Sequence, residues 1–393
     1  MINANRFEGT SRAVLEVAER FAKQGHEVDL LARTVQDVDL ESLKWVRIPG
    51  IKRPEVADFA SYQWLVDRRL AKSDYDIIHS AGPNTSRADV YTIQTVHPVK
   101  MRMMELAGAH HAASALRKLS RRVYDYCVVR AEKAAYTASH SRGPRAFLPV
   151  SRGTRDELVG TYPNILAPGF DNVFEVPNGA DLHRFSPVNR ERHRRDVRSE
   201  HRLGDQDFVL VFSGGDWIRK GLDVAIRSIA ATSNPAIKLL VVGHDRAGAE
   251  VMALPEDLGI TDRVVFAGFR SDVHRYYAAG DLFLFPTTYE AFSLATIEAA
   301  ASGLPVLMPD VSGANELLGE GTCGTLIERQ PKSIARVVED YVSHPERLEA
   351  HSRNARRLVE ERFNWDAIAD QTMRVYEQLL GARLDRRVGG VGE

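Results

Sequence analysis

Short apolar runs rich in β-branched residues alternate with helical stretches through the second half of this 393-residue chain, and this alternation constrains the fold most strongly. Glycine follows two of the runs, at Gly214 and Gly243, where a strand-to-helix turn needs a permissive backbone. Runs of this length between helices are typical of buried parallel strands. The pattern predicts a doubly wound α/β domain. Its strands are expected at 208–212, 237–242, 263–266, 282–285 and 305–308.

The first half carries a looser version of the same pattern. A helix is expected over about 11–25, followed by strands at 27–32, 44–48, 75–79, 90–95 and 146–150. Only a few residues precede Gly9, where a first turn would follow the first strand. We therefore predict a second α/β domain whose first strand is short or absent.

The length of the chain exceeds what one hydrophobic core usually organises, so two domains are expected. A charged stretch at 189–202 predicts a solvated helix that opens the second domain. We place the N-terminal domain at 1–185 and the C-terminal domain at 186–364. Residues 365–393 are predicted to form an amphipathic helix that runs to about residue 380, followed by a tail.

Composition narrows the class of protein. The 52 Lys and Arg nearly balance the 53 Asp and Glu, so net charge suggests no nucleic-acid partner. Cys127 and Cys323 have no metal-ligand spacing, which predicts neither a disulfide framework nor a metal site. No apolar stretch approaches 20 residues and no secretion signal opens the chain. We expect a cytoplasmic protein.

The segment from Pro286 to Val306 carries the strongest chemical signal, a strand, loop, helix and strand in sequence. Its helix is predicted to begin near Ser293, so its positive dipole end faces the sheet edge where doubly wound folds bind anions. Glu290 precedes this helix and Glu298 lies within it, two acceptors for sugar hydroxyls. The alternative is a capping Glu290 and a solvated Glu298, but small apolar neighbours of Glu298 favour a packed helix.

Arg219 and Lys220 follow the glycine pair Gly214 and Gly215. A guanidinium fork and an ammonium in this place can hold a diphosphate and stabilise the charge that develops on it, without a metal ion. The alternative is that two adjacent basic residues at a helix start are merely solvated.

The segment with Glu290 and Glu298 resembles the paired-glutamate signature of retaining glycosyltransferase family 4. Residues 208–222 resemble the strand, loop and Arg/Lys-Gly segment of that family, Val176-Pro177-Asn178-Gly179 its interdomain Pro-Asn-Gly element, and the turn at Gly9 its glycine-rich turn. The sequence from Gly215 to Gly221 is similar to the corresponding segment of lipopolysaccharide core glucosyltransferases that extend a heptose. The resemblance implies two Rossmann-like domains facing a cleft, the B-type glycosyltransferase fold, with the helix of residues 365–393 crossing back toward the N-terminal domain. It further implies that Glu290 holds donor-sugar hydroxyls, Glu298 the ribose, and Arg219 with Lys220 the diphosphate of a nucleotide-sugar. Donor contacts are also expected from Ala291, Phe292, Ser293 and Leu294.

Weaker candidates complete the predicted site. The resemblance places Gly9 and Thr10 near the donor, although Glu8 stands where relatives have a first glycine, which puts close backbone approach in doubt. His97 is a candidate catalytic group, and a loop or core histidine is an equal alternative. Phe269 is a candidate at the base, with a core aromatic as the alternative. Asn178 and Gly179 are acceptor-side or interdomain candidates, or simply a turn.

The basic stretch 100–145, with Arg117-Lys118 and Arg121-Arg122, predicts a solvated face, a site for an anionic acceptor, or contact with a membrane surface. We expect a hexosyltransferase that uses no cofactor. It is expected to transfer a hexose from a nucleotide-sugar, with a UDP-sugar as the favoured donor, to a cell-surface glycan or glycolipid such as lipopolysaccharide core. Alternatives are a nucleotide-sugar-binding relative without ordinary transfer and an enzyme making a soluble glycoside. A nicotinamide oxidoreductase is disfavoured because neither half has a G-x-G-x-x-G turn after its strand.

Overall fold

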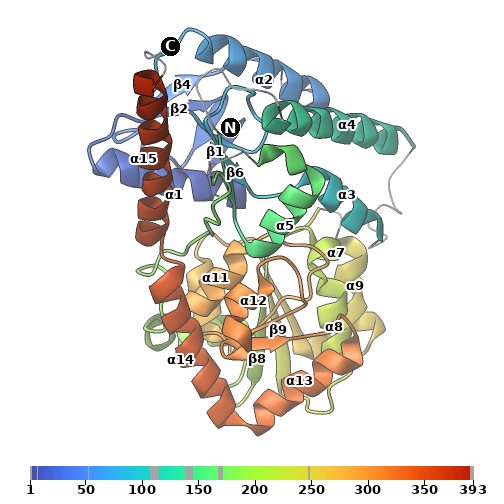
Figure 1. Cartoon of the computed structure of the whole chain (residues 1–393). Coiled ribbons are helices and arrows are strands. Elements are labelled where there is room, and N and C mark those ends of the chain that lie inside the picture. The colour runs from blue at the N-terminus through green and yellow to red at the C-terminus, as the bar shows by residue number, and fades with distance from the viewer. Residues whose placement is uncertain are drawn as a thin grey trace. The chain divides into compact units, whose positions relative to one another are not determined.

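The computed structural model describes residues 2–6, 8–51, 53–106, 115–137, 145–166, 171–246 and 248–389, without the side chains of 115–118 and 384–389. The chain divides into two compact units, residues 1–178 with 365–393 and residues 179–364. Figure 1 shows both as layers of helices around strands. Part of the basic stretch 100–145, including the side chains of Arg117 and Lys118, and the last residues of the predicted tail, 390–393, lie outside what is described.

The second unit is built on one six-stranded parallel sheet. It comprises β8 (Phe208–Ser213), β9 (Ile237–Val242), β10 (Val264–Gly268), β11 (Leu282–Leu284), β12 (Val306–Met308) and β13 (Gly324–Leu326). Their order is β10-β9-β8-β11-β12-β13. The chain thus runs outward from β8 through β9 to β10, then returns to lie beside β8 and runs outward the other way. This reversal between β8 and β11 is the switch point at which doubly wound sheets bind ligands.

Helices cover the sheet because each presents one apolar face. In α8 (Leu222–Ala230) the residues Leu222, Ala225, Ile226 and Ile229 are buried at helical spacing. This helix packs on α13 (Pro331–Ser343). Other helices of the unit, besides α6 below, are α7 (Trp217–Lys220), α9 (Ala249–Asp257), α10 (Val273–Ala279), α11 (Leu294–Ala301), α12 (Ala314–Leu318) and α14 (Pro345–Arg362).

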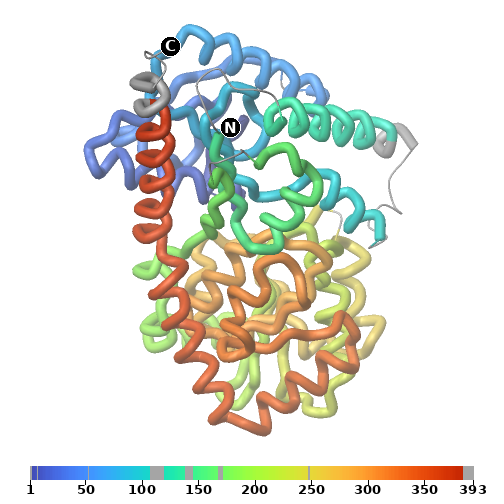
Figure 2. Tube along the Cα trace, viewed as in Figure 1, coloured from blue at the N-terminus to red at the C-terminus, as the bar shows by residue number. Residues whose placement is uncertain are grey.

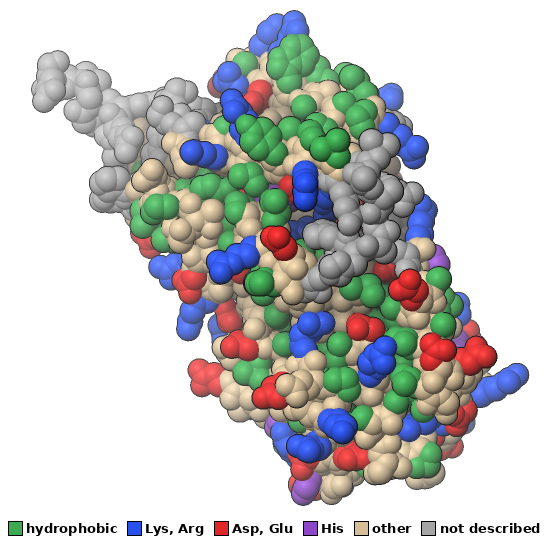
Figure 3. Space-filling view, turned by 90° about the vertical axis from the view of Figure 1, so that its right-hand side faces the viewer, with side chains coloured by type: hydrophobic (Ala, Val, Ile, Leu, Met, Phe, Trp, Pro, Cys, Tyr) green, Lys and Arg blue, Asp and Glu red, His purple; other side chains and the backbone are tan. Residues whose placement is uncertain are grey.

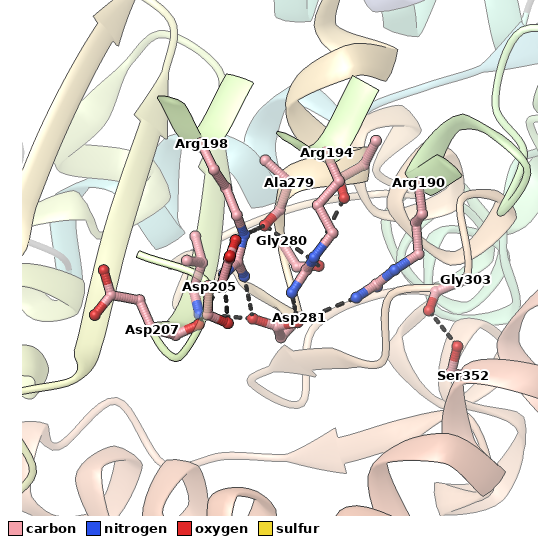
Figure 4. A network of polar contacts seen from close by, with 12 residues as sticks. Arg190, Arg194, Arg198, Asp205, Asp207, Ala279, Gly280, Asp281, Gly303 and Ser352 are labelled. Atoms are coloured by element: carbon pink, nitrogen blue, oxygen red, sulfur yellow. Dashed lines mark hydrogen bonds and ion pairs between the residues drawn. The ribbon is translucent and has the colours of Figure 1, made fainter. Parts of the chain in front are cut away.

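A buried carboxylate anchors α6 (Asn189–Glu200), the helix predicted at the start of the second domain, to the sheet (Figure 4). Asp281, just before β11, accepts from Arg190 at 3.1 Å, Arg194 at 2.7 Å and Arg198 at 2.8 Å. The surplus positive charge is spread over main-chain carbonyls, among them those of Ala279 and Gly280 at the end of α10. The carbonyls at a helix C-terminus attract cations, so both Asp281 and the end of α10 hold the arginines of α6 in place.

The first unit has its parallel strands in three pieces. β1 (Asn3–Asn5) pairs with β3 (Thr34–Gln36), β2 (Asp29–Ala32) pairs with β4 (Lys44–Arg47), and β5 (His79–Ala81), β6 (Val90–Ile93) and β7 (Ala146–Pro149) form a third sheet. The first strand, which the sequence predicted to be short or absent, is the three-residue β1. The helices include α1 (Gly9–Lys23), α2 (Glu55–Leu70), α3 (His97–Leu106), α4 (Ala115–Thr137) and α5 (Arg152–Thr161).

The last helix, α15 (Trp365–Gly389), belongs to the first unit, as the red end of the trace beside the blue segment shows (Figure 2). It packs on α1, where the rings of Tyr376 and Phe21 lie 5.4 Å apart and Asp366 pairs with Arg20 at 2.6 Å. The apolar periodicity after Trp365 predicted a helix to about residue 380, and the helix continues beyond it.

Two features differ from the sequence-based expectation. The division between units falls after Asn178, whereas the boundary was placed after residue 185. Ala180 and Phe185 belong with the second unit because they bond to Phe363 and Arg356, respectively. In addition, the strand expected at 75–79 begins only at His79, because Asp89 takes the amide of Ile78 with its side chain at 2.7 Å.

Candidate functional site

Two loops meet at the switch point of the second unit, one after β8 and one after β11. They are fixed to each other by main-chain contacts, since the amide of Thr288 donates to the carbonyl of Arg219 at 2.8 Å. Gly221 lies against the carbonyl of Pro286 with φ +78°, so a side chain there would collide with the neighbouring loop. The geometry of one loop is therefore set by the other.

Arg219 joins the two loops through its side chain. Its Nη1 donates to Glu290 Oε1 and to the carbonyl of Tyr289, both at 2.7 Å, and its Nε donates to Asp216 at 2.6 Å. Burial acts to lower the pKa of Arg219, but Glu290 and Asp216 outweigh it and raise that pKa. Its Nη2 has no hydrogen bond to any residue that the structure describes. One edge of the guanidinium fork is thus held, and the other can receive an oxyanion.

Lys220 presents an ammonium with no ion pair or hydrogen bond among the described residues. Its Nζ lies 5.4 Å from the centroid of the Phe285 ring, a cation–π contact. Burial lowers the pKa of Lys220, while Glu290 and other carboxylates oppose that effect. The ammonium fills the space beside Gly214 where a side chain would stand, and φ +128° also favours glycine there. Gly214 thus permits this position of the charge.

Gly215 is equally restricted, because a Cβ there would meet the carbonyl of His244 at 3.0 Å. That carbonyl belongs to the turn after β9, whose Asp245 accepts from the amide of Trp217 at 2.8 Å. The Trp217 indole in turn donates to the carbonyl of Gly214 at 3.0 Å. The glycine loop is therefore anchored at the carboxyl ends of both β8 and β9.

Glu298 lies within α11 and is buried, at 5% exposure. Its carboxylate acts electrostatically on Lys220, which places the two side chains at one site. Ser293 caps the helix, accepting from the amide of Thr296 at 3.3 Å. The helix thus begins where the sequence predicted, and its positive end lies beside Glu290 at the edge of the sheet.

The other donor-side candidates differ in their surroundings. Ala291, Phe292 and Leu294 are buried, and the Phe292 ring packs on Phe363 at 5.3 Å, so this aromatic supports the loop from beneath. Phe269, after β10, is 64% exposed. Phe269 thus lies exposed at the carboxyl edge of the sheet, and the core position considered from the sequence is not what the structure shows.

Gly9 and Thr10 lie in the first unit, at the start of α1. Thr10 lines a pocket of about 410 Å³, which we name the α1 pocket. Glu8, Glu55 and Asp58 contribute carboxylates to it, and no Lys or Arg that the structure describes is among its lining residues. It is lined by Ile2, Asn3, Glu8, Thr10, Ser11, Glu55, Asp58, Phe59, Ala81, Asn84 and Tyr124.

His97 is buried in the first unit at the start of α3. Its Nε2 lies 3.0 Å from Asp125 Oδ1 of α4, and its amide donates to Glu132 at 3.1 Å. Burial lowers the pKa of His97, and the hydrogen bond with Asp125 acts against that effect. Glu132 also accepts from the Tyr162 hydroxyl at 2.9 Å, and burial raises the pKa of Glu132 to about 7. His97 is therefore held by two carboxylates that the sequence analysis did not single out.

Asn178 is the last residue of the first unit before the chain enters the second unit, which begins at Gly179. The Asn178 amide forms a reciprocal pair with Gln94, with distances of 2.7 and 3.2 Å, and it is buried. This pair ties the end of the first unit to the segment that follows β6.

Comparison with known proteins identifies the family. The "Glycosyl transferases group 1" family matches residues 193–358, and the "Glycosyltransferase Family 4" domain matches residues 7–184. The chain belongs to this family of glycosyltransferases. The matches together take in both units, and the six-stranded unit with Arg219, Lys220, Glu290 and Glu298 lies in the group 1 region.

Relatives extend over most of the chain. D-inositol 3-phosphate glycosyltransferase 1 of Catenulispora acidiphila is 26% identical, over 95% of this chain and 91% of its own. Lipopolysaccharide glucosyltransferase WaaG of Escherichia coli is 24% identical, over 82% of each chain. A crystal structure of WaaG superposes with a TM-score of 0.77, 22% identity and coverage of 94% of this chain and 97% of that one. HepE of Anabaena in complex with UDP-glucose gives 0.67, 18% identity and coverage of 96% and 98%.

The glycosyltransferase therefore has the B-type fold, as the sequence predicted. Sequence reasoning missed Asp216, Asp125 and Glu132, which position Arg219 and His97. Asp216 could have been found, because it precedes Arg219 by three residues, a spacing at which side chains on a helix can pair. Nothing in the spacing of Asp125 and Glu132 from His97 indicated their contact.

Proposed function

We propose that this glycosyltransferase moves a hexose from a nucleotide-sugar to a cell-surface glycan or glycolipid, with a UDP-sugar as the favoured donor. The observation that carries the proposal is the Lys220 ammonium, which has no counter-ion within bridging distance among the described residues and lies at the switch point of the sheet. An ammonium removed from water without a partner is costly unless an anion joins it. A diphosphate between Lys220 and the Arg219 fork is such an anion.

The remaining roles follow from the same loops. Glu290 and Glu298 are acceptors, so in this proposal they hold the hydroxyls of the donor sugar and the ribose. Arg219 and Lys220 would stabilise the charge on the leaving diphosphate, which makes a metal ion unnecessary. WaaG, which acts in lipopolysaccharide biosynthesis, and HepE, seen with UDP-glucose, support the choice of acceptor and donor class. Family membership supports retention of anomeric configuration.

The α1 pocket is the proposed place for the acceptor sugar. Its carboxylates and amides suit hydroxyl or amine groups, and they would repel a phosphate. We therefore propose an acceptor whose terminal sugar is not phosphorylated at the end that enters this pocket. The relative from Catenulispora is named for an inositol phosphate, so the acceptor is expected to differ there.

The basic stretch bears on where the acceptor is met. On α4, Leu119, Val123 and Tyr126 are exposed at helical spacing, with Arg122 and Arg130 beside them. Figure 3 shows hydrophobic side chains among Lys and Arg on this side of the first unit. No described helix is long and apolar enough to cross a membrane. We propose that this α4 face rests on an anionic bilayer.

A thermal-shift panel tests the donor. UDP-glucose, GDP-mannose and ADP-glucose are added separately to the protein in buffer with EDTA. Bound donor raises the melting temperature by mass action, so a rise with the UDP-sugar and without metal is expected. No rise with any of the three, or a rise only after Mg²⁺ is added, would contradict the proposal.

Co-sedimentation with phosphatidylglycerol vesicles at low salt, and not with phosphatidylcholine vesicles, tests the α4 face.

A further inference from the structure

A second and larger cavity, of about 710 Å³, lies inside the first unit between α1, α2, α15 and the strands β2 and β5. Its size falls within the range of small-molecule pockets. Apolar side chains from the three helices and β2 form much of its wall, including Val14, Val17, Phe21, Leu31, Val66 and Met373. We name it the chain cavity.

Several polar groups of its inner wall are hydrogen-bonded to other side chains or to a main-chain carbonyl. Both ring nitrogens of His79 are bonded, Nδ1 to the Tyr376 hydroxyl at 2.6 Å and Nε2 to Thr92 Oγ1 at 2.7 Å. Burial lowers the pKa of His79 to about 4, so the ring is neutral. The Tyr62 hydroxyl donates to the carbonyl of Leu31 at 2.7 Å, and the Tyr75 hydroxyl to Asp29 at 2.6 Å. The inner wall therefore suits an apolar guest.

The two ends of the chain cavity differ. At one end the lining residues Lys44, Asp74 and Glu377 are exposed, so this end reaches water. At the other end Ala81 and Asn84 line both this cavity and the α1 pocket. Lys44 begins β4 and Ala81 ends β5, so the lining residues include the first residue of one strand and the last residue of another. A hydrocarbon chain is the guest that suits a cavity with an apolar inner wall, exposed lining residues and a border with the α1 pocket.

We propose that the chain cavity holds a hydrocarbon chain of the acceptor glycolipid, whose sugar head occupies the adjoining α1 pocket. The placement of the sugar head rests on the proposed function. The placement of the hydrocarbon chain rests on the apolar wall of the chain cavity. It explains why an apolar cavity adjoins a polar pocket at one turn, residues 81–84. The free energy for a buried chain comes from apolar area removed from water.

Fluorescence of cis-parinaric acid, an 18-carbon fatty acid, tests the chain site on the full-length protein. Saturable binding to the wild type is expected. Met373→Trp fills the cavity and should weaken binding at least tenfold, as should Val17→Phe from the opposite helix. Arg374→Trp, at the exposed neighbouring position, is the matched control and should bind as the wild type does. Melting temperatures of the filled variants should be retained or raised, which separates filling from misfolding.

Alkyl glycosides then distinguish an acceptor from a free fatty acid. Dodecyl glucoside should displace cis-parinaric acid at least tenfold better than hexyl glucoside does. Thr10→Trp, which narrows the α1 pocket, should weaken the dodecyl glucoside and leave the fatty acid unaffected. Equal binding of the fatty acid to wild type and to Met373→Trp would overturn the chain site. A Thr10→Trp variant that binds both probes normally would overturn the acceptor assignment.

Calorimetry with UDP keeps the two proposals separate. The chain-cavity variants should bind UDP as the wild type does, because they lie outside the second unit. Absence of UDP binding in the wild type would count against the proposed function, while cis-parinaric acid binding would still decide the chain site.

Discussion

The guanidinium of Arg219 donates to the carboxylate of Glu290 across 2.7 Å, although the two residues lie 71 positions apart in the sequence. A cation expected to bind phosphate is thus paired with the acid expected to bind sugar. The donor must therefore share these groups, since Arg219 keeps its Nη2 and Glu290 keeps its Oε2 for other partners.

Glu290→Gln should separate the two roles. The amide cannot hold Arg219 as tightly, so the fork is released toward phosphate and UDP affinity should be retained or improved. Loss of a charged acceptor for the sugar hydroxyl should lower kcat/KM for the UDP-sugar by about 10- to 150-fold, a loss of roughly 1.5–3 kcal/mol. Calorimetry with UDP and initial rates with the UDP-sugar measure the two effects. UDP affinity that falls along with the rate would contradict this division of roles.

Glu132 makes stability depend on pH in a defined direction. Its pKa is raised by burial from 4.5 to about 7, so the folded protein keeps a proton that the unfolded chain releases. Stability from this group is full below about pH 4.5 and is lost as pH rises through 7, by about 3 kcal/mol in all. Glu132→Gln should flatten the urea-unfolding free energy over this window, and Glu105→Gln, at an exposed site, should not. Equal pH slopes in the wild type and Glu132→Gln would refute the assignment.

Asp281→Asn should destabilise the second unit. The substitution leaves Arg198, 2% exposed, and two further guanidinium groups without their carboxylate. Removing one partner of a buried ion pair costs about 3–5 kcal/mol. Urea unfolding measures this loss, and Asp262→Asn, at an exposed carboxylate, is the control. A change below about 1 kcal/mol, in the range of surface pairs, would show that the arginines are satisfied by carbonyls alone.

Sequence was a good guide where local pattern and tertiary structure agree. The apolar runs at 208–212 and 237–242 became β8 and β9 because continuous buried runs suit a sheet covered on both faces. Ser293 capped α11 as predicted, since capping is a local interaction. β13, the three residues Gly324–Leu326, was not predicted because so short a run has no period.

Contacts between residues far apart in the sequence could not be predicted from local sequence patterns. The Arg219–Glu290 pair needs the switch-point topology, which brings two loops together. The hold of Asp125 and Glu132 on His97 depends on the packing of α3 against α4. The chain cavity depends on α15, from the far end of the sequence, lying beside α1. Each requires the fold before the contact can be inferred.

Titration calorimetry of UDP into the wild type and Lys220→Met, in buffer containing EDTA, tests the central claim most directly. The account predicts metal-free binding to the wild type and a loss of about 10- to 150-fold in Lys220→Met, the value of one charged hydrogen bond. Lys332→Met, at an exposed position in α13, should bind UDP as the wild type does. Equal affinity of the wild type and Lys220→Met, or binding that requires an added divalent ion, would contradict it.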